Sequence, residues 1–217
     1  MATPAETSGS KPFRAILWKE WRESWGLLLL AVIAPCTGHI AMPENPTQEW
    51  IFVTPAIVFI ALCMGARLFA GEYARGTAHF RDECPAGRGL VWAATVTLPI
   101  AALLLGVLAK AVFGLCISLG LVPPHKGLFL VQILAEGLLA FAIGAFLSVI
   151  MDRPIIAVGA GGVICTAGVV LLAALTFHGI VTKSPPESVW ALAAVCYALA
   201  IYLLYLSRKI FVRWRRD

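Results

Sequence analysis

Residues 154–182 read PIIAVGAGGVICTAGVVLLAALTFHGIVT and contain no Asp, Glu, Lys or Arg. An uncharged apolar stretch of about 18 residues or more is long enough to cross the hydrocarbon core of a bilayer as one helix. A second uncharged stretch covers residues 51–66. These two stretches indicate that lipid is the solvent for much of the chain.

The composition of the whole chain supports a membrane protein. Of its 217 residues, 60% are hydrophobic and 13% are charged, whereas soluble domains have about 45–50% apolar and about 25% charged residues. A soluble fold could not bury that much apolar surface, so soluble classes are excluded. The six cysteines form no CxxC pair, and we therefore expect neither a metal site nor a disulfide framework. No cofactor is expected.

Six segments approach the length of a spanning helix, and each is bounded by proline, glycine or charged residues. They are roughly residues 25–42, 51–70, 90–122, 128–150, 155–177 and 189–206. The sequence therefore predicts an all-α, polytopic membrane protein with six transmembrane helices.

The transmembrane domain is predicted to be the only domain, over residues 25–207. It is expected to follow a disordered tail (residues 1–10) and an amphipathic helix (residues 11–24), and to end in a basic cytoplasmic tail (residues 208–217). The connections between spans are too short to fold alone.

Basic residues set the predicted orientation, because short cytoplasmic loops are enriched in Lys and Arg. Alternate loops and both ends carry most of the bases: Lys11, Arg14, Lys19, Arg22, Arg75, Arg81, Arg88, Arg153, Arg208, Lys209, Arg213, Arg215 and Arg216. The opposite loops carry only Lys126 and Lys183. Both termini are therefore predicted to be cytoplasmic.

The segment before the first span, PFRAILWKEWRESW, has the pattern of an interfacial helix. Four apolar residues recur every four positions and share one helical face: Phe13, Leu17, Trp21 and Trp25. Trp18 also falls near the predicted membrane boundary, which indole rings favour. Such a helix would rest on membrane lipids, with its bases against anionic headgroups. The alternative is a cytoplasmic extension of the first span with no special role.

The connection over residues 71–89, GEYARGTAHFRDECPAGRG, is too charged to insert into a membrane. Its charges alternate in sign, and Pro85 would end a helix within it, so it predicts a short helix at the cytoplasmic surface. Such a helix could dock a partner or serve as an ordinary connection, and physical reasoning alone does not choose between them.

This connection resembles the signature of type-2 ATP-binding-cassette (ABC) transporter permeases, in which an acidic residue, Gly-Thr, a short run, Pro and Arg precede the third span. The matching positions are Glu72, Gly76, Thr77, Pro85 and Arg88. Residues 17–23 (LWKEWRE) are similar to the elbow helix of that family. One departure is the run HFRDEC, where the family carries leucines, so that Phe80 is left as the main apolar contact.

The resemblance implies a permease subunit with an elbow helix, marked by Leu17, Trp18 and Trp21, and a cytoplasmic coupling helix. Two copies of a separate ATP-binding subunit would dock on the connection, through Glu72, Arg75, Gly76, Thr77, Phe80, Pro85 and Arg88. A second permease subunit, identical or different, would complete a dimer. The expected location is the plasma membrane, here a bacterial inner membrane, and the expected activity is export of an unidentified substrate.

The chain itself is not expected to be an enzyme or to bind nucleic acid, and it has no GxxxxGK[ST] phosphate loop. Two other functions stay open. An intramembrane lipid transferase or protease would need clustered carboxylates or histidines, but the four histidines are scattered: His39, His79, His125 and His178. A secondary transporter that works alone would have inverted repeats, and no repeat is evident.

Two charged residues lie deepest in predicted spans. Lys110 is about 18 Å and Glu136 about 14 Å from the outer ends of adjacent spans, at 1.5 Å per residue. Because the connection between these spans is short, we expect antiparallel neighbours and a Lys110–Glu136 ion pair, with Gln132 one turn away. The pair would act as a structural clamp or line a translocation path.

The fifth predicted span is rich in small residues, which let helix backbones approach closely. They are Gly159, Ala160, Gly161, Gly162, Ala167 and Gly168. The sequence predicts a packing face within the chain here, with a dimer interface as the alternative.

Overall fold

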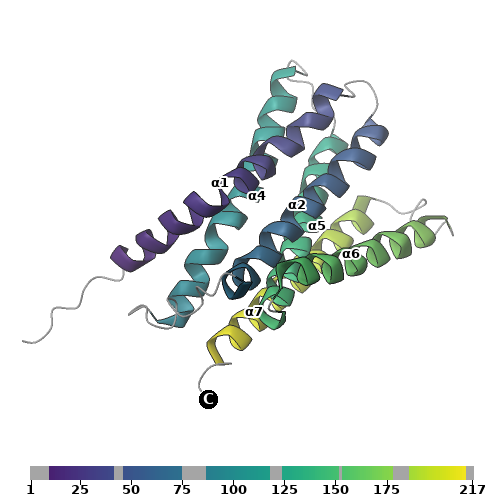
Figure 1. Ribbon diagram of the computed structural model, residues 1–217. Helices are drawn as coiled ribbons and strands as arrows, with labels where there is room; N and C mark the ends of the chain where they lie inside the picture. Colours follow the sequence, from purple (N-terminus) through teal and green to yellow (C-terminus); the bar gives the residue numbers. More distant parts are fainter. Residues whose placement is uncertain are drawn as a thin grey trace, which may run out of the picture.

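The computed structural model describes residues 10–41, 46–74, 87–117, 124–151, 153–177 and 186–213. These residues form six helices and no strand: α1 (Ser10–Ala41), α2 (Pro46–Ala74), α4 (Arg88–Ile117), α5 (Pro124–Ile150), α6 (Pro154–Phe177) and α7 (Pro186–Arg213). The prediction of an all-α fold is confirmed (Figure 1).

Within the described residues, four helices are long and apolar enough to cross a membrane. Their apolar stretches are Val53–Ala70, Arg88–Val112, Leu130–Ile150 and Trp190–Arg213, which correspond to the second, third, fourth and sixth predicted spans. The helices α1 and α6 are not among them, and the described apolar part of α6, Pro154–Gly168, is shorter. These helices indicate a membrane protein, whereas the number of six spans stays a prediction.

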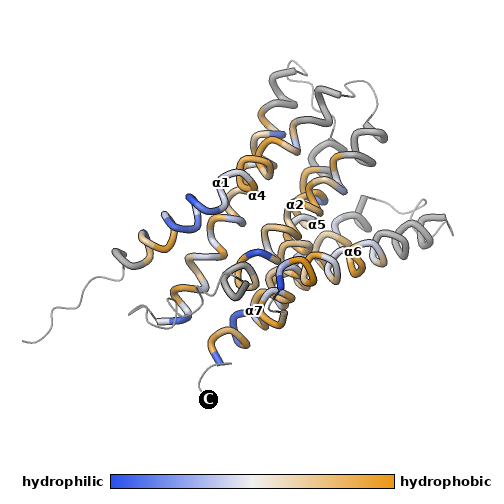
Figure 2. The backbone as a smooth tube through the Cα atoms, in the orientation of Figure 1, coloured by the Kyte–Doolittle hydropathy of each residue, from blue (hydrophilic) through white to orange (hydrophobic). Residues whose placement is uncertain are grey.

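The helices alternate in direction, so that their termini gather at two ends of the bundle (Figure 1). One end holds the starts of α1, α4 and α6 and the last turns of α2, α5 and α7. It carries the bases Arg14, Lys19, Arg22, Arg67, Arg88, Arg153, Arg208, Lys209 and Arg213. We call it the basic end, and hydrophilic residues mark it in Figure 2. Its cytoplasmic position stays a prediction.

The centre of the bundle is the contact between α2 and α5. A Cβ atom added to Gly65 would meet the carbonyl oxygen of Phe141, and one added to Gly144 would lie 2.5 Å from the carbonyl oxygen of Leu62. Each helix therefore presses its backbone onto a glycine of the other, as small residues allow in membrane proteins. The other pairs in contact include α1 with α4, α5 with α7, and α2 with α6.

The predicted elbow segment is part of a longer helix. Because α1 runs without interruption from Ser10 to Ala41, no break separates residues 11–24 from the first predicted span. A distinct elbow helix is therefore not confirmed. On this part of α1, Trp18 is 67% and Trp21 50% exposed, whereas Leu17 is half-buried.

The small residues of α6 form the predicted packing face within the chain only in part, at Ala160 and Gly161. A Cβ atom at Gly159, Gly162 or Gly168 would meet no atom within 4 Å, whereas one at Gly161 would fall against the side chain of Leu62. Large apolar residues of α6 are also exposed, with Ile155 at 84% and Val163 at 71%. The expectation of packing within the chain is therefore correct for Gly161 and wrong for the three open glycines, because α6 touches α2 and α5 along one side only.

Candidate functional site

Most of the predicted docking residues lie outside the described residues: Arg75, Gly76, Thr77, Phe80 and Pro85. Glu72 belongs to α2, and Arg88 is the half-buried first residue of α4. The structure thus describes the two helix ends that flank this segment. We call residues 67–74 the α2 stem and residues 88–95 the α4 stem, and both lie at the basic end (Figure 1).

A hydrogen bond joins the α2 stem to α1. The guanidinium of Arg67 donates a hydrogen bond from Nη2 to the main-chain carbonyl of Glu23. Arg67 thus joins two helices. The segment predicted as the elbow is therefore bonded to the α2 stem.

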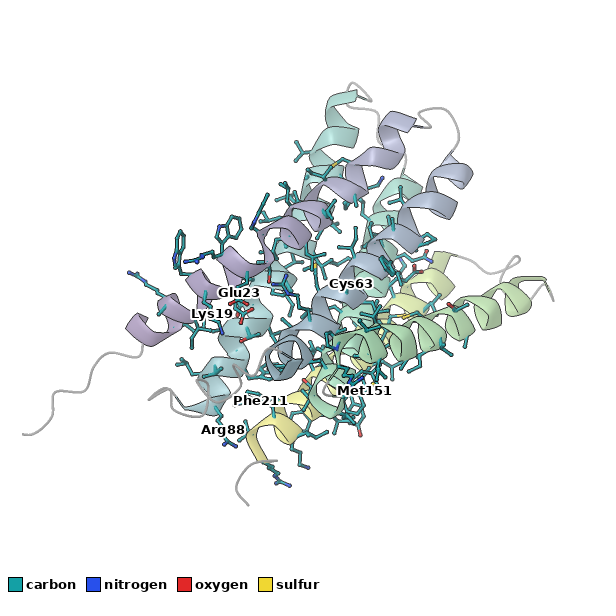
Figure 3. The ribbon with its side chains drawn as sticks, in the orientation of Figure 1. Lys19, Glu23, Cys63, Arg88, Met151 and Phe211 are labelled. Atoms are coloured by element: carbon teal, nitrogen blue, oxygen red, sulfur yellow. The ribbon has the colours of Figure 1, made fainter. Side chains whose placement is uncertain are left out.

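Two acidic residues of α1, Glu20 and Glu23, lie at the contact between α1 and the α2 stem. Glu20 is only 8% exposed, and Glu20, Glu23 and Arg67 line a cleft between α1, α2 and α4 that also includes Pro99 of α4. Figure 3 shows Glu23 next to Lys19 on this part of α1. A buried carboxylate needs protein partners, and Glu20 is one of the residues with such an interaction. The sequence pattern gave no sign that Glu20 would be buried, because Glu20 belongs to a run of charged residues.

Lys110 is buried in the contact between α4 and α1. Its side chain is 7% exposed, and Nζ donates a 3.0 Å hydrogen bond to the main-chain carbonyl of Pro35. Proline has no N–H, so the carbonyl of Ala31, one turn earlier, has lost its helical donor. Gly106 lies against that carbonyl, because a Cβ atom at Gly106 would contact the oxygen of Ala31. Gly106 and Lys110, one turn apart on α4, therefore meet Ala31 and Pro35, one turn apart on α1.

Glu136 has a different partner. The amide of Gln132, one turn away on α5, donates a 2.9 Å hydrogen bond to its Oε1. The hydroxyl of Tyr197 on α7 donates to the carbonyl of Val131, next to Gln132, at 3.2 Å. Neither the Lys110 bond nor the Glu136 bond joins the two residues to each other. The Lys110–Glu136 ion pair stays a prediction.

These polar groups are dispersed over separate helix contacts. Among the described residues, no group of three or more His, Cys, Asp or Glu side chains could hold a metal ion. The hydroxyls of Thr95, Ser148 and Thr166 each bond to the carbonyl of a nearby residue on the same helix. The bonds of Arg67, Lys110 and Tyr197 instead join different helices. In the described part of the chain, Glu20, Glu23 and Arg67 share one cleft, whose lining does not include Lys110 or Glu136.

Comparison with known proteins adds no family. No family model matches the chain, and no curated protein matches it. The function is therefore inferred from the residues of this chain and their geometry.

Proposed function

We propose that this chain is the permease subunit of an ABC transporter, a membrane half that a separate ATP-binding subunit drives. Two features support this proposal. The first is the pattern of Glu72, Gly76, Thr77, Pro85 and Arg88 in the predicted coupling segment. The second, which carries it furthest, is the hydrogen bond from Arg67 to the Glu23 carbonyl, because it joins α1 to the stem of that segment.

The mechanical consequence follows from helix stiffness. If the ATP-binding subunit displaces residues 75–86, the α2 and α4 stems, which flank this segment, are the first parts to move. Through Arg67 the α2 stem would carry α1 with it, and α1 is packed on α4 in turn. One displaced segment would thus move three helices, which is what a subunit without its own ATPase needs in order to use hydrolysis by a partner.

In this proposal the basic end faces the cytoplasm, since bases are retained on that side. The membrane is the plasma membrane, here a bacterial inner membrane, and six spans with both termini inside complete the subunit. Two ATP-binding subunits and a second permease subunit, identical or different, complete the transporter. The substrate moves outward.

The permease is a better proposal than an intramembrane enzyme. Enzymes that cut or transfer groups in membranes bring acids, bases or nucleophiles together at one place. Among the described residues, Lys110 bonds to a main-chain carbonyl of α1 and Glu136 to an amide of α5. The Lys110 bond joins α4 to α1 and the Glu136 bond lies within α5, so these two charges do not favour a shared reaction centre.

Co-purification tests the proposal. The chain is expressed together with ATP-binding subunits from its own genome, extracted in mild detergent and isolated through a tag on the permease. Phe80→Ala should lower the bound ATP-binding subunit about tenfold, which corresponds to about 1.4 kcal/mol, because apolar anchors dominate such contacts. The matched control is Phe59→Ala, since Phe59 is 59% exposed on α2 and lies away from the α2 stem. Absence of any bound ATP-binding subunit from the unaltered chain would overturn the proposal.

A further inference from the structure

The last turns of α7 reach the α4 stem. The indole Nε1 of Trp92 donates a hydrogen bond to Oγ of Ser207 at 3.3 Å, and the Ser207 hydroxyl donates to the carbonyl of Leu204 at 2.9 Å. Ser207 is completely buried. One turn before Trp92, a Cβ atom at Gly89 would lie 3.6 Å from the guanidinium of Arg208. Two successive residues of α7 therefore lie against the first turns of α4.

The same turns of α7 reach the α2 stem. The rings of Phe69 and Phe211 lie 4.7 Å apart between centroids and are tilted by 39°, within the range in which aromatic pairs attract. Phe69 is 1% exposed and Phe211 is half-buried. Phe211 lies at the basic end of the molecule, as Arg88 does (Figure 3).

These contacts contrast with the rest of α7. The helix packs on α5, and three of its buried residues are spaced by seven: Ala193, Ala200 and Ser207. Much of its remaining surface is open, with Ile201 at 68%, Tyr202 at 57% and Tyr205 at 56% exposed. The contacts with the two stems are thus local to residues 207–211, at the end of a helix that is otherwise held on one side.

We propose that Ser207 and Phe211 of α7 are positioning residues that hold the α2 and α4 stems at a fixed separation, so that both stems move together when the ATP-binding subunit acts on residues 75–86. This inference rests on the proposed permease function. It assigns to α7 a role that the coupling motif itself does not contain. Residues 207–211 would thus join the two stems in addition to α1, which is bonded to the α2 stem through Arg67 and packs on α4.

The first experiment uses the complex of the full chain with its ATP-binding subunit in lipid nanodiscs. Two quantities are measured for each variant: the ATP-binding subunit bound per permease, and ATP hydrolysed per bound subunit. Ser207→Ala and Phe211→Ala should leave the bound amount within about twofold and lower hydrolysis per bound subunit about threefold to tenfold. Tyr205→Ala is the matched control, because Tyr205 is an exposed aromatic residue on the same part of α7, and it should change neither quantity.

A reversible cross-link separates positioning from simple destabilisation. Phe69→Cys and Phe211→Cys are combined in a chain whose six native cysteines are replaced by alanine, and the pair is joined by a short bis-thiosulfonate reagent. The cross-linked complex should retain ATP hydrolysis, because the link replaces the ring contact. Reduction of the link should lower hydrolysis to the level of Phe211→Ala, and renewed cross-linking should restore it.

The possible failures are distinct. If the unaltered chain binds no ATP-binding subunit, the proposed function is wrong, and this inference is wrong as well. If the subunit binds and Ser207→Ala and Phe211→Ala hydrolyse ATP like the unaltered chain, only the inference is overturned. It is also overturned if these variants lose bound subunit while hydrolysis per bound subunit stays normal, because α7 would then merely shape the docking surface.

Discussion

The contact of α2 with α5 and the contact of α1 with α4 both depend on glycine, but they differ in what surrounds it. Gly65 and Gly144 press against each other's helix backbones among buried apolar side chains. Gly106 instead lies beside Pro35, in a contact closed by the Lys110 hydrogen bond. The first contact joins two helix backbones directly, as expected of a fixed core. The second contact contains Pro35, which removes one backbone hydrogen bond from α1, and the Lys110 hydrogen bond, which can break and form again. These features are expected where two helices move relative to each other.

The largest expected effect is in the fixed core. Gly144→Val would place a Cβ atom 2.5 Å from the Leu62 carbonyl oxygen and 2.8 Å from the Ala66 nitrogen, and backbone atoms of a packed helix cannot move aside cheaply. We expect a loss of about 3 kcal/mol of unfolding free energy, measured by thermal unfolding of the detergent-solubilised chain. Gly162→Val is the control, because Gly162 faces open space. Equal melting temperatures for both variants would show that α2 and α5 do not meet as described.

A smaller effect is expected at the second contact. A Cβ atom at Gly106 would contact the Ala31 carbonyl oxygen and lie 3.2 Å from Cγ of Pro35. Because Pro35 leaves α1 without one backbone hydrogen bond, α1 can yield more readily here than the α2 backbone, and Gly106→Val should cost about 2 kcal/mol. Thermal unfolding again measures it, with Gly26→Val as control, since Gly26 is open. A cost above that of Gly144→Val would reverse the comparison between the two contacts.

The smallest of the three effects concerns the polar bond. Lys110→Met keeps the length of the side chain and removes the donor to Pro35. Because the ammonium is costly to bury, its loss should lower stability by only about 1 kcal/mol. Thermal unfolding measures this effect, and Thr97→Val is the control, since the Thr97 hydroxyl bonds only within its own helix at an exposed position. A rise in melting temperature would contradict a stabilising role for the Lys110 bond.

The sequence predicted the apolar helices well and their contacts poorly. The stretches that became α2, α4, α5 and α7 are long and uncharged enough to be recognised one by one. The elbow was predicted as a separate helix from its apolar face and from a family resemblance. An apolar face does not itself mark a helix end, however, and α1 continues through that point. Composition thus locates apolar segments more reliably than helix boundaries.

The candidate site shows the same limit. Counting residues predicted that Lys110 would be deep, and it is buried. Depth along a helix says nothing of the direction in which a side chain points, so the sequence did not indicate the carbonyl of Pro35 as a partner. The burial of Glu20 and the bond from Arg67 to Glu23 likewise depend on how α1 crosses α2, which no local pattern records.

The most direct test of the permease proposal is a cross-link from the coupling segment. A photoreactive residue replaces Phe80, or Val163 as the control because Val163 is 71% exposed on α6, and membranes that contain both subunits are illuminated. The proposal predicts an adduct of the permease with the ATP-binding subunit from position 80 and none from position 163. No adduct from position 80, in membranes where the ATP-binding subunit is present, would contradict it.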